Sequence, residues 1–303
     1  MKAIFKLFIF VVAFFYAETS FCLTIVTSNY PAFDIASHVV GDKAKVKVLL
    51  KPGTDAHRYE PSPKDLGAIE ECDLFYYTGG ENDEWIERLL NSTSKNINTL
   101  SMLDSITPLS ESDAFSHTFE AHNHHHDEAF DEHVWTSLKN DIVLIDDFAK
   151  KISAIDPKNA DFYKKNAHDY VNKFVALDIE FTALIKNSKR QVLVFADRFP
   201  FLYFVHDYGL DYYAAFSGCA EDTEASPKTV ASLIKKVIEL KTPYVLCQEF
   251  STEKLAKTVA LETNTEVLTF NACHNISKKQ YQDKVELIEL LRQNFESLKK
   301  ALN

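Results

Sequence analysis

The segment NADFYKKNAHDYVNKFVALDIEFTALIK, residues 159–186, decides the architecture of this chain. Its apolar side chains recur at intervals of three, four, three, four and three residues, at Ala167, Tyr170, Phe174, Leu177, Phe181 and Leu184. This spacing predicts one buried face of an α-helix. At about 1.5 Å per residue a continuous helix would run about 40 Å. The segment contains neither glycine nor proline, so we expect a stiff helix without an obvious hinge residue.

Short β-branched or aromatic runs alternate with helix-like stretches on both sides of this segment. The runs occupy residues 23–27, 46–50 and 74–77 before it, and 192–195, 244–247 and 267–270 after it. This alternation indicates parallel, buried strands flanked by helices. We therefore predict an α/β fold with two lobes, residues 23–157 and 188–303, and one long rigid connecting helix at 158–187.

The first 22 residues carry the features of a secretory signal peptide. Lys2 and Lys6 flank the start of an apolar run, Leu7 to Phe15, that is too short to span a bilayer. If Cys22 becomes the first mature residue it could carry lipid, although the bulky Phe21 is unusual before such a cysteine. We expect a periplasmic or other extracytoplasmic protein, either free or lipid-anchored through Cys22.

The charge balance and the missing motifs exclude several classes of protein. The chain has 44 acidic and 33 basic residues and a formal net charge of −11, and its Lys and Arg do not cluster as a nucleic-acid-binding protein requires. A negative field does concentrate cations. With seven glycines, the chain has no Gly-rich phosphate-binding loop, and the G-x-S-x-G and H-E-x-x-H motifs are absent as well.

Histidines alternate with carboxylates in TFEAHNHHHDEAFDEHVW, residues 118–135. Neutral imidazole is a common ligand for zinc and its neighbours. We predict that the loop 111–130 is a mobile tether that holds extra, weaker zinc. A merely solvated polar loop is the alternative, whereas a purification tag would sit at a terminus. The five histidines concerned are His117, His122, His124, His125 and His126.

Four ordered motifs carry a family resemblance. They are GTDAHRYEPSPKD at 53–65, GENDEW at 80–85, DEHVWTS at 131–137 and YFVHDYGL at 203–210. In this order and spacing they closely resemble the zinc and manganese solute-binding proteins of bacterial ABC transporters, and the His-rich loop resembles that of the zinc branch. The similarity extends from about Leu23 to the C-terminus. It implies two lobes joined by one long helix, with a metal bound in the cleft and delivered to a membrane permease.

The resemblance implies a set of metal ligands, with two departures. His57 and His133 match the family's first two ligands, and His57 follows a strand end, where open α/β sheets bind ligands. Arg198 stands where the family usually has His or Glu, and arginine has no lone pair to donate. The adjacent Asp197 either coordinates the metal or pairs with Arg198. Asn271 replaces the family's acidic ligand.

His274 lies three residues after Asn271, and we predict that it takes the missing place. Zinc would then be held by His57, His133 and His274, with water or a carboxylate, Asp197 before Glu249, in the fourth position. Glu249 otherwise orients a ligand imidazole or pairs with Arg198. We also hypothesise a disulfide between Cys219 and Cys273.

The sequence thus predicts a monomeric, non-enzymatic protein that captures Zn²⁺ for an ABC importer permease and binds no nucleic acid. Manganese is the less favoured cargo, because imidazole-rich ligation suits zinc better. Two alternatives stay open. One is a metal-sequestering adhesin of the same fold, and the other is a zinc hydrolase with Glu249 as its general base.

Overall fold

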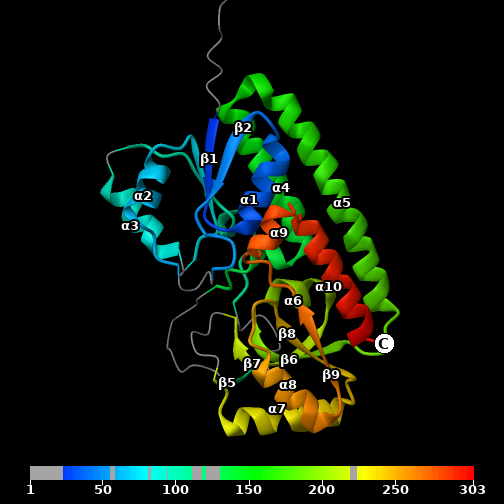
Figure 1. Ribbon diagram of the computed structural model, residues 1–303. Coiled ribbons are helices and arrows are strands. Elements are labelled where there is room, and N and C mark those ends of the chain that lie inside the picture. Colours follow the sequence, from blue (N-terminus) through cyan, green and yellow to red (C-terminus); the bar gives the residue numbers. More distant parts are fainter. Residues whose placement is uncertain are drawn as a thin grey trace, which may run out of the picture.

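The computed structural model describes residues 23–54, 59–80, 83–93, 95–110, 118–120, 130–218 and 224–303. The predicted signal peptide with Cys22, the predicted ligand His57, the five histidines at 117–126 and Cys219 lie outside these ranges. The predicted fold class is confirmed. Figure 1 shows two α/β lobes, each built on a parallel sheet, with the long helix α5 running along one side of both.

The first lobe is built on a four-stranded parallel sheet in the order β2-β1-β3-β4. Its strands are β1 (Leu23–Thr27), β2 (Ala44–Val48), β3 (Leu74–Tyr77) and β4 (Thr99–Ser101), and its helices include α1 (Tyr30–Val40), α2 (Pro63–Glu70), α3 (Glu84–Ser92) and α4 (Leu138–Ile155). Ile25 and Leu74 face the main core, whereas their neighbours Val26 and Phe75 belong to a separate cluster on the other face. Both faces of the sheet are therefore covered, as parallel strands require.

The second lobe contains a five-stranded parallel sheet in the order β5-β7-β6-β8-β9. Its strands are β5 (Thr118–Glu120), β6 (Val192–Phe199), β7 (Asp211–Ser217), β8 (Tyr244–Gln248) and β9 (Glu266–Phe270). The helices that follow β6 along the chain are α6 (Leu202–Tyr208), α7 (Pro227–Leu240), α8 (Lys254–Thr263), α9 (Lys278–Gln282) and α10 (Leu287–Ala301). In Figure 1, α7 and α8 lie at the far end of this lobe from the first one.

Two segments differ from the predicted division of the chain. Thr118 pairs with Ala214, so β5 is an edge strand of the second sheet rather than part of a loop of the first lobe. After β9 the chain returns to the first lobe, where Ile276 accepts a hydrogen bond from the Gly53 N–H at 2.8 Å. Both placements depend on contacts between residues that are far apart in the sequence, and short-range sequence patterns do not predict such contacts.

The long helix α5 spans Ala160–Lys186 and buries the predicted apolar face. Its N-terminal half packs on α4 and α1, and α10 packs against its other half, where the rings of Phe181 and Phe295 lie 5.2 Å apart. The buried face of α5 belongs to one continuous core that includes Ile25 of the first sheet and Phe195 of the second. The helix therefore holds both lobes through shared packing. Within the described residues, no helix combines the length and apolar character needed to cross a membrane.

Asp141, in the first turn of α4, is fully buried in this core. Within the described residues neither of its carboxyl oxygens has a hydrogen-bond partner. Burial, and to a lesser extent the nearby Asp34, raises the pKa of Asp141 well above its usual value. A buried carboxyl of this kind stays protonated when the unfolded chain has already lost its proton.

Asp141→Asn should therefore stabilise the protein increasingly as the pH rises. A carboxyl whose pKa is raised in the folded state contributes its full stabilising effect below the unfolded pKa of about 3.9. As the pH rises from there to the folded pKa, the free energy of unfolding falls by about 1.4 kcal/mol per pH unit. Asparagine cannot lose a proton in this way, so the variant does not share this loss. Urea unfolding of the parent and the variant between pH 3.5 and pH 8 measures the difference. Parallel stability curves would show that the carboxyl is not protonated in the fold.

Candidate metal site

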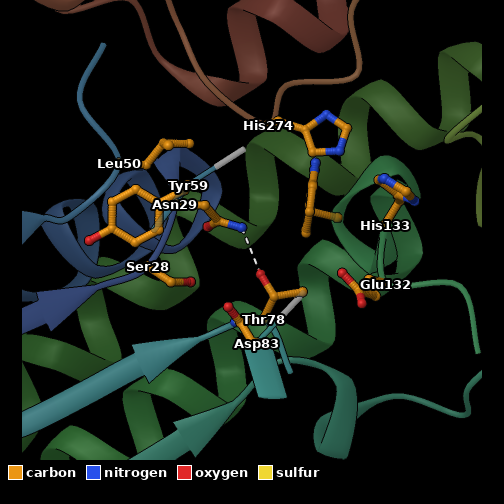
Figure 2. Close-up of a pocket in the computed structure, with 10 residues that line it drawn as sticks. Ser28, Asn29, Leu50, Tyr59, Thr78, Asp83, Glu132, His133 and His274 are labelled. Atoms are coloured by element: carbon orange, nitrogen blue, oxygen red, sulfur yellow. Dashed lines mark hydrogen bonds between the residues drawn. The ribbon is translucent and has the colours of Figure 1, made fainter. Parts of the chain in front are cut away.

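A small pocket lies at the edge of the first sheet that faces the second lobe. Ser28 and Asn29 follow β1, Leu50 follows β2 and Thr78 follows β3. These four pocket residues therefore lie at the carboxyl ends of adjacent parallel strands. Such edges are where open α/β sheets bind ligands. The other lining residues are Tyr59, Asp83, Glu132, His133, Trp135 and His274, and Figure 2 shows His133 and His274 side by side there.

The two histidines come together from segments that are far apart in the sequence. His133 is almost fully buried and immediately precedes the 3₁₀ turn Val134–Thr136, whereas His274 lies in the loop after β9. Their ring centroids are 4.6 Å apart and the rings are nearly perpendicular, at 83°. Two imidazoles in this relation can offer nitrogen ligands to one cation.

Asp131 orients the His133 ring. Its Oδ1 accepts a hydrogen bond from the His133 backbone N–H at 2.7 Å and lies 2.9 Å from His133 Nδ1. Since a carboxylate only accepts, Nδ1 carries the proton and Nε2 keeps the lone pair that a metal needs. The Tyr203 hydroxyl donates to the Asp131 carbonyl at 2.7 Å, which anchors this segment to α6. This role of Asp131 was not predicted from the sequence, although the Asp-x-His spacing of the DEHVW motif is a signal for it.

The loop that carries His274 is held by Glu249 and Trp135. Glu249 accepts hydrogen bonds from the backbone N–H groups of Ala272, at 2.5 Å, and Cys273, at 2.7 Å. The Trp135 indole N–H donates to the Ala272 carbonyl at 2.8 Å, and its ring lies edge-on to His274 with centroids 5.2 Å apart. Burial raises the pKa of Glu249 to about 7 against the lowering effect of these N–H donors. Glu249 therefore contacts the backbone of the two residues before His274.

The structure does not bring Asp197 to the two histidines. Its carboxylate accepts hydrogen bonds from the backbone N–H groups of Gln248, at 3.1 Å, and Arg198, at 2.9 Å. Asp197, Arg198 and Glu249 line a different cavity, in the second lobe. Asp197 accordingly bridges backbone groups of β6 and β8, in contrast to the two roles that the sequence suggested for it. Asn271 hydrogen-bonds with Asn294 of α10 and is also absent from the pocket lining.

Two other carboxylates, which sequence analysis did not select, line the pocket. Asp83 accepts backbone hydrogen bonds from Thr78 and Gly79 at 3.1 and 3.0 Å. Glu132 packs over Gly80, where a Cβ would lie 2.5 Å from its Cγ. Burial raises the pKa of Asp83 to about 7, and the nearby Glu132 charge adds to the effect. In their charged form, these carboxylates give the histidine pocket a negative field that favours cations.

The described residues place two candidate ligands, His133 and His274, in one pocket. Among them, no group of three or more His, Cys, Asp or Glu side chains is placed to hold a metal ion. Residues 55–58, which include His57, lie outside the described ranges, and Tyr59, which follows them, lines the pocket. The fold and the pocket together define a two-lobed α/β binding protein with a histidine-containing site between its lobes.

Comparison with known proteins identifies the family. The model of the family described as zinc-uptake complex component A, periplasmic, matches residues 25–301. The chain belongs to this family. The zinc-binding protein AdcA of Streptococcus pyogenes serotype M18 is 30% identical over 289 residues, which cover 91% of this chain and 55% of that protein. The chain thus spans about half the length of the AdcA relatives that it matches.

Other relatives match along most of their length. The high-affinity zinc uptake system protein ZnuA of Bacillus subtilis is 26% identical over 284 residues, covering 92% of this chain and 88% of that protein. The structure of the Zn(II)-bound ZnuA-like domain of Streptococcus pneumoniae AdcA superimposes with a TM-score of 0.79 at 27% identity. That match covers 93% of this chain and 99% of that chain.

Replacing the carboxylate that orients His133 should weaken metal binding. We expect Asp131→Ala to raise the Kd for zinc roughly 10- to 100-fold, the usual effect of losing a group that fixes a ligand imidazole. Competitive titration against a chromophoric chelator measures the change. Asp147→Ala, which removes an aspartate on the partly exposed side of α4, is the control. Equal affinities in the two variants would show that Asp131 does not prepare His133.

Proposed function

We propose that this protein captures Zn²⁺ outside the cytoplasm and delivers it to the membrane permease of an ABC importer. The observation that carries the proposal is the approach of His133 and His274 to 4.6 Å between their ring centroids, in a chain that belongs to the zinc-uptake family. The Streptococcus pneumoniae AdcA domain of the same fold was solved with Zn(II) bound.

We propose His57, His133 and His274 as the zinc ligands. His57 is two residues before Tyr59, which lines the pocket with the other two histidines. Zinc accepts three imidazoles with one further ligand. Water, or a carboxylate of Asp83 or Glu132 in the pocket, is the candidate for that position. Asp197 is left out of this set because backbone N–H groups of the second lobe already engage its carboxylate.

Capture and release, without bond chemistry, is the activity that the described site supports. A zinc hydrolase would need a general base within hydrogen-bond reach of a metal-bound water. Glu249, the candidate for that base, instead accepts two backbone hydrogen bonds from the His274 loop. The family and its AdcA and ZnuA relatives are named for zinc binding and uptake, which does not favour an adhesin. The histidines at 117–126 remain candidates for weaker accessory zinc sites.

Zinc should stabilise the protein more than manganese does. A ligand that binds only the folded state adds about 2.7 kcal/mol at a concentration of 100 Kd, and imidazole ligation favours zinc over manganese. Thermal unfolding of dialysed protein, with and without each metal, measures both effects. The proposal fails if zinc leaves the melting temperature unchanged or if manganese raises it further. Growth of a deletion strain under zinc chelation then tests delivery to the importer.

The three histidines should contribute to one tight site. We expect His57→Ala, His133→Ala and His274→Ala each to weaken zinc binding by at least about 100-fold, since each removes a direct ligand. Asn271→Ala should leave the affinity nearly unchanged, because Asn271 bonds to Asn294 away from the pocket. Competitive zinc titrations compare the four variants. Near-normal affinity in His274→Ala would remove His274 from the site.

A further inference from the structure

The segment after β9 crosses from the second lobe to the first and carries His274 with it. The Tyr30 N–H, at the start of α1, donates to the His274 carbonyl at 3.4 Å, and the Gly53 N–H donates to the Ile276 carbonyl at 2.8 Å. Glu249 binds the same segment from the second lobe through Ala272 and Cys273. In Figure 1 the chain passes from β9 to α9, which lies near α1. The His274 loop is therefore fastened on both sides.

The side chain of Asn275 connects this loop to the first lobe through two hydrogen bonds. Its side chain is buried, at 4% exposure. Its Nδ2 group donates to the Lys51 carbonyl at 2.7 Å and to the Thr54 carbonyl at 2.8 Å. Its Oδ1 accepts the Ile276 N–H at 2.8 Å. One amide side chain thus uses both its hydrogens on a segment more than 200 residues away in the chain.

The two carbonyls that Asn275 binds belong to one turn. The Thr54 N–H donates to the Lys51 carbonyl at 3.1 Å, which closes the turn after β2. Thr54 is three residues before His57. A side-chain amide is suited to this position, because it supplies two donors from one nitrogen without the cost of burying a charge. Asn275 therefore fixes the turn at residues 51–54 relative to the backbone of His274.

We propose that Asn275 is a positioning residue for metal capture, because it joins the loop carrying His274 to the turn at residues 51–54 of the first lobe. This inference rests on the proposed zinc site. The hydrogen bonds hold the His274 loop against the first lobe before the metal arrives, so the ordering cost at binding is reduced. Groups that position ligands contribute to affinity without touching the metal.

Two substitutions at Asn275 test the proposal. Asn275→Ala removes all three hydrogen bonds. Asn275→Asp keeps the acceptor for the Ile276 N–H but loses both donors, and its added negative charge would by itself attract a cation. We expect both variants to raise the zinc Kd roughly 10- to 100-fold. We also expect a changed visible spectrum of the Co²⁺-loaded protein, which reports the ligand geometry. A weaker affinity in Asn275→Asp would therefore identify the lost donors as the cause.

Asn271→Ala is the matched control, since Asn271 is also a buried asparagine but bonds to Asn294 of α10. Melting temperatures of all metal-free variants separate lost stability from lost affinity. The inference is overturned if the Asn275 variants bind zinc like Asn271→Ala, or if they only melt earlier. The His57→Ala and His274→Ala variants judge the site independently. If the two histidine variants also bind zinc normally, the proposed function fails. If the histidine variants lose zinc and the Asn275 variants do not, only the role of Asn275 fails.

Discussion

The packing of one apolar face of α5 against both lobes is the constraint on which the rest of the structure depends. The buried stripe contacts a single core that contains residues of both sheets. A helix without glycine or proline resists bending, so the facing edges of the two sheets are held at a set separation. The pocket between them is consequently assembled by packing that is remote from the pocket itself.

Within this frame, polar side chains place the histidines. Asp131 holds the ring of His133, and Glu249 with Trp135 holds the loop of His274. Asp131 and Trp135 are buried and Glu249 is partly buried, and a buried polar group is costly unless it is hydrogen-bonded. The same bonds that satisfy them leave little freedom to the segments they bind. Preorganisation of this kind favours high affinity, because the histidine-bearing segments are already ordered when the ligand binds.

The positions at which the sequence predicted departures from the family's ligand pattern have structural roles of their own. Arg198 and Asp197 lie at the end of β6 and line a cavity of the second lobe, while Asn271 joins β9 to α10 through Asn294. His274 instead lies against His133. Asn271, directly after β9, therefore bonds to α10, and His274, three residues later, lines the pocket.

The sequence by itself determined the elements whose signals are local. The three-and-four spacing predicted α5, the apolar runs predicted the main strands, and the DEHVWTS motif identified His133. Tertiary structure alone decided that β5 joins the second sheet, that Asp83 and Glu132 line the pocket, and that Asn275 reaches the turn before His57. Periodicity records which side of an element is buried. It does not record which distant loop arrives there, because that depends on the packing of both lobes against α5.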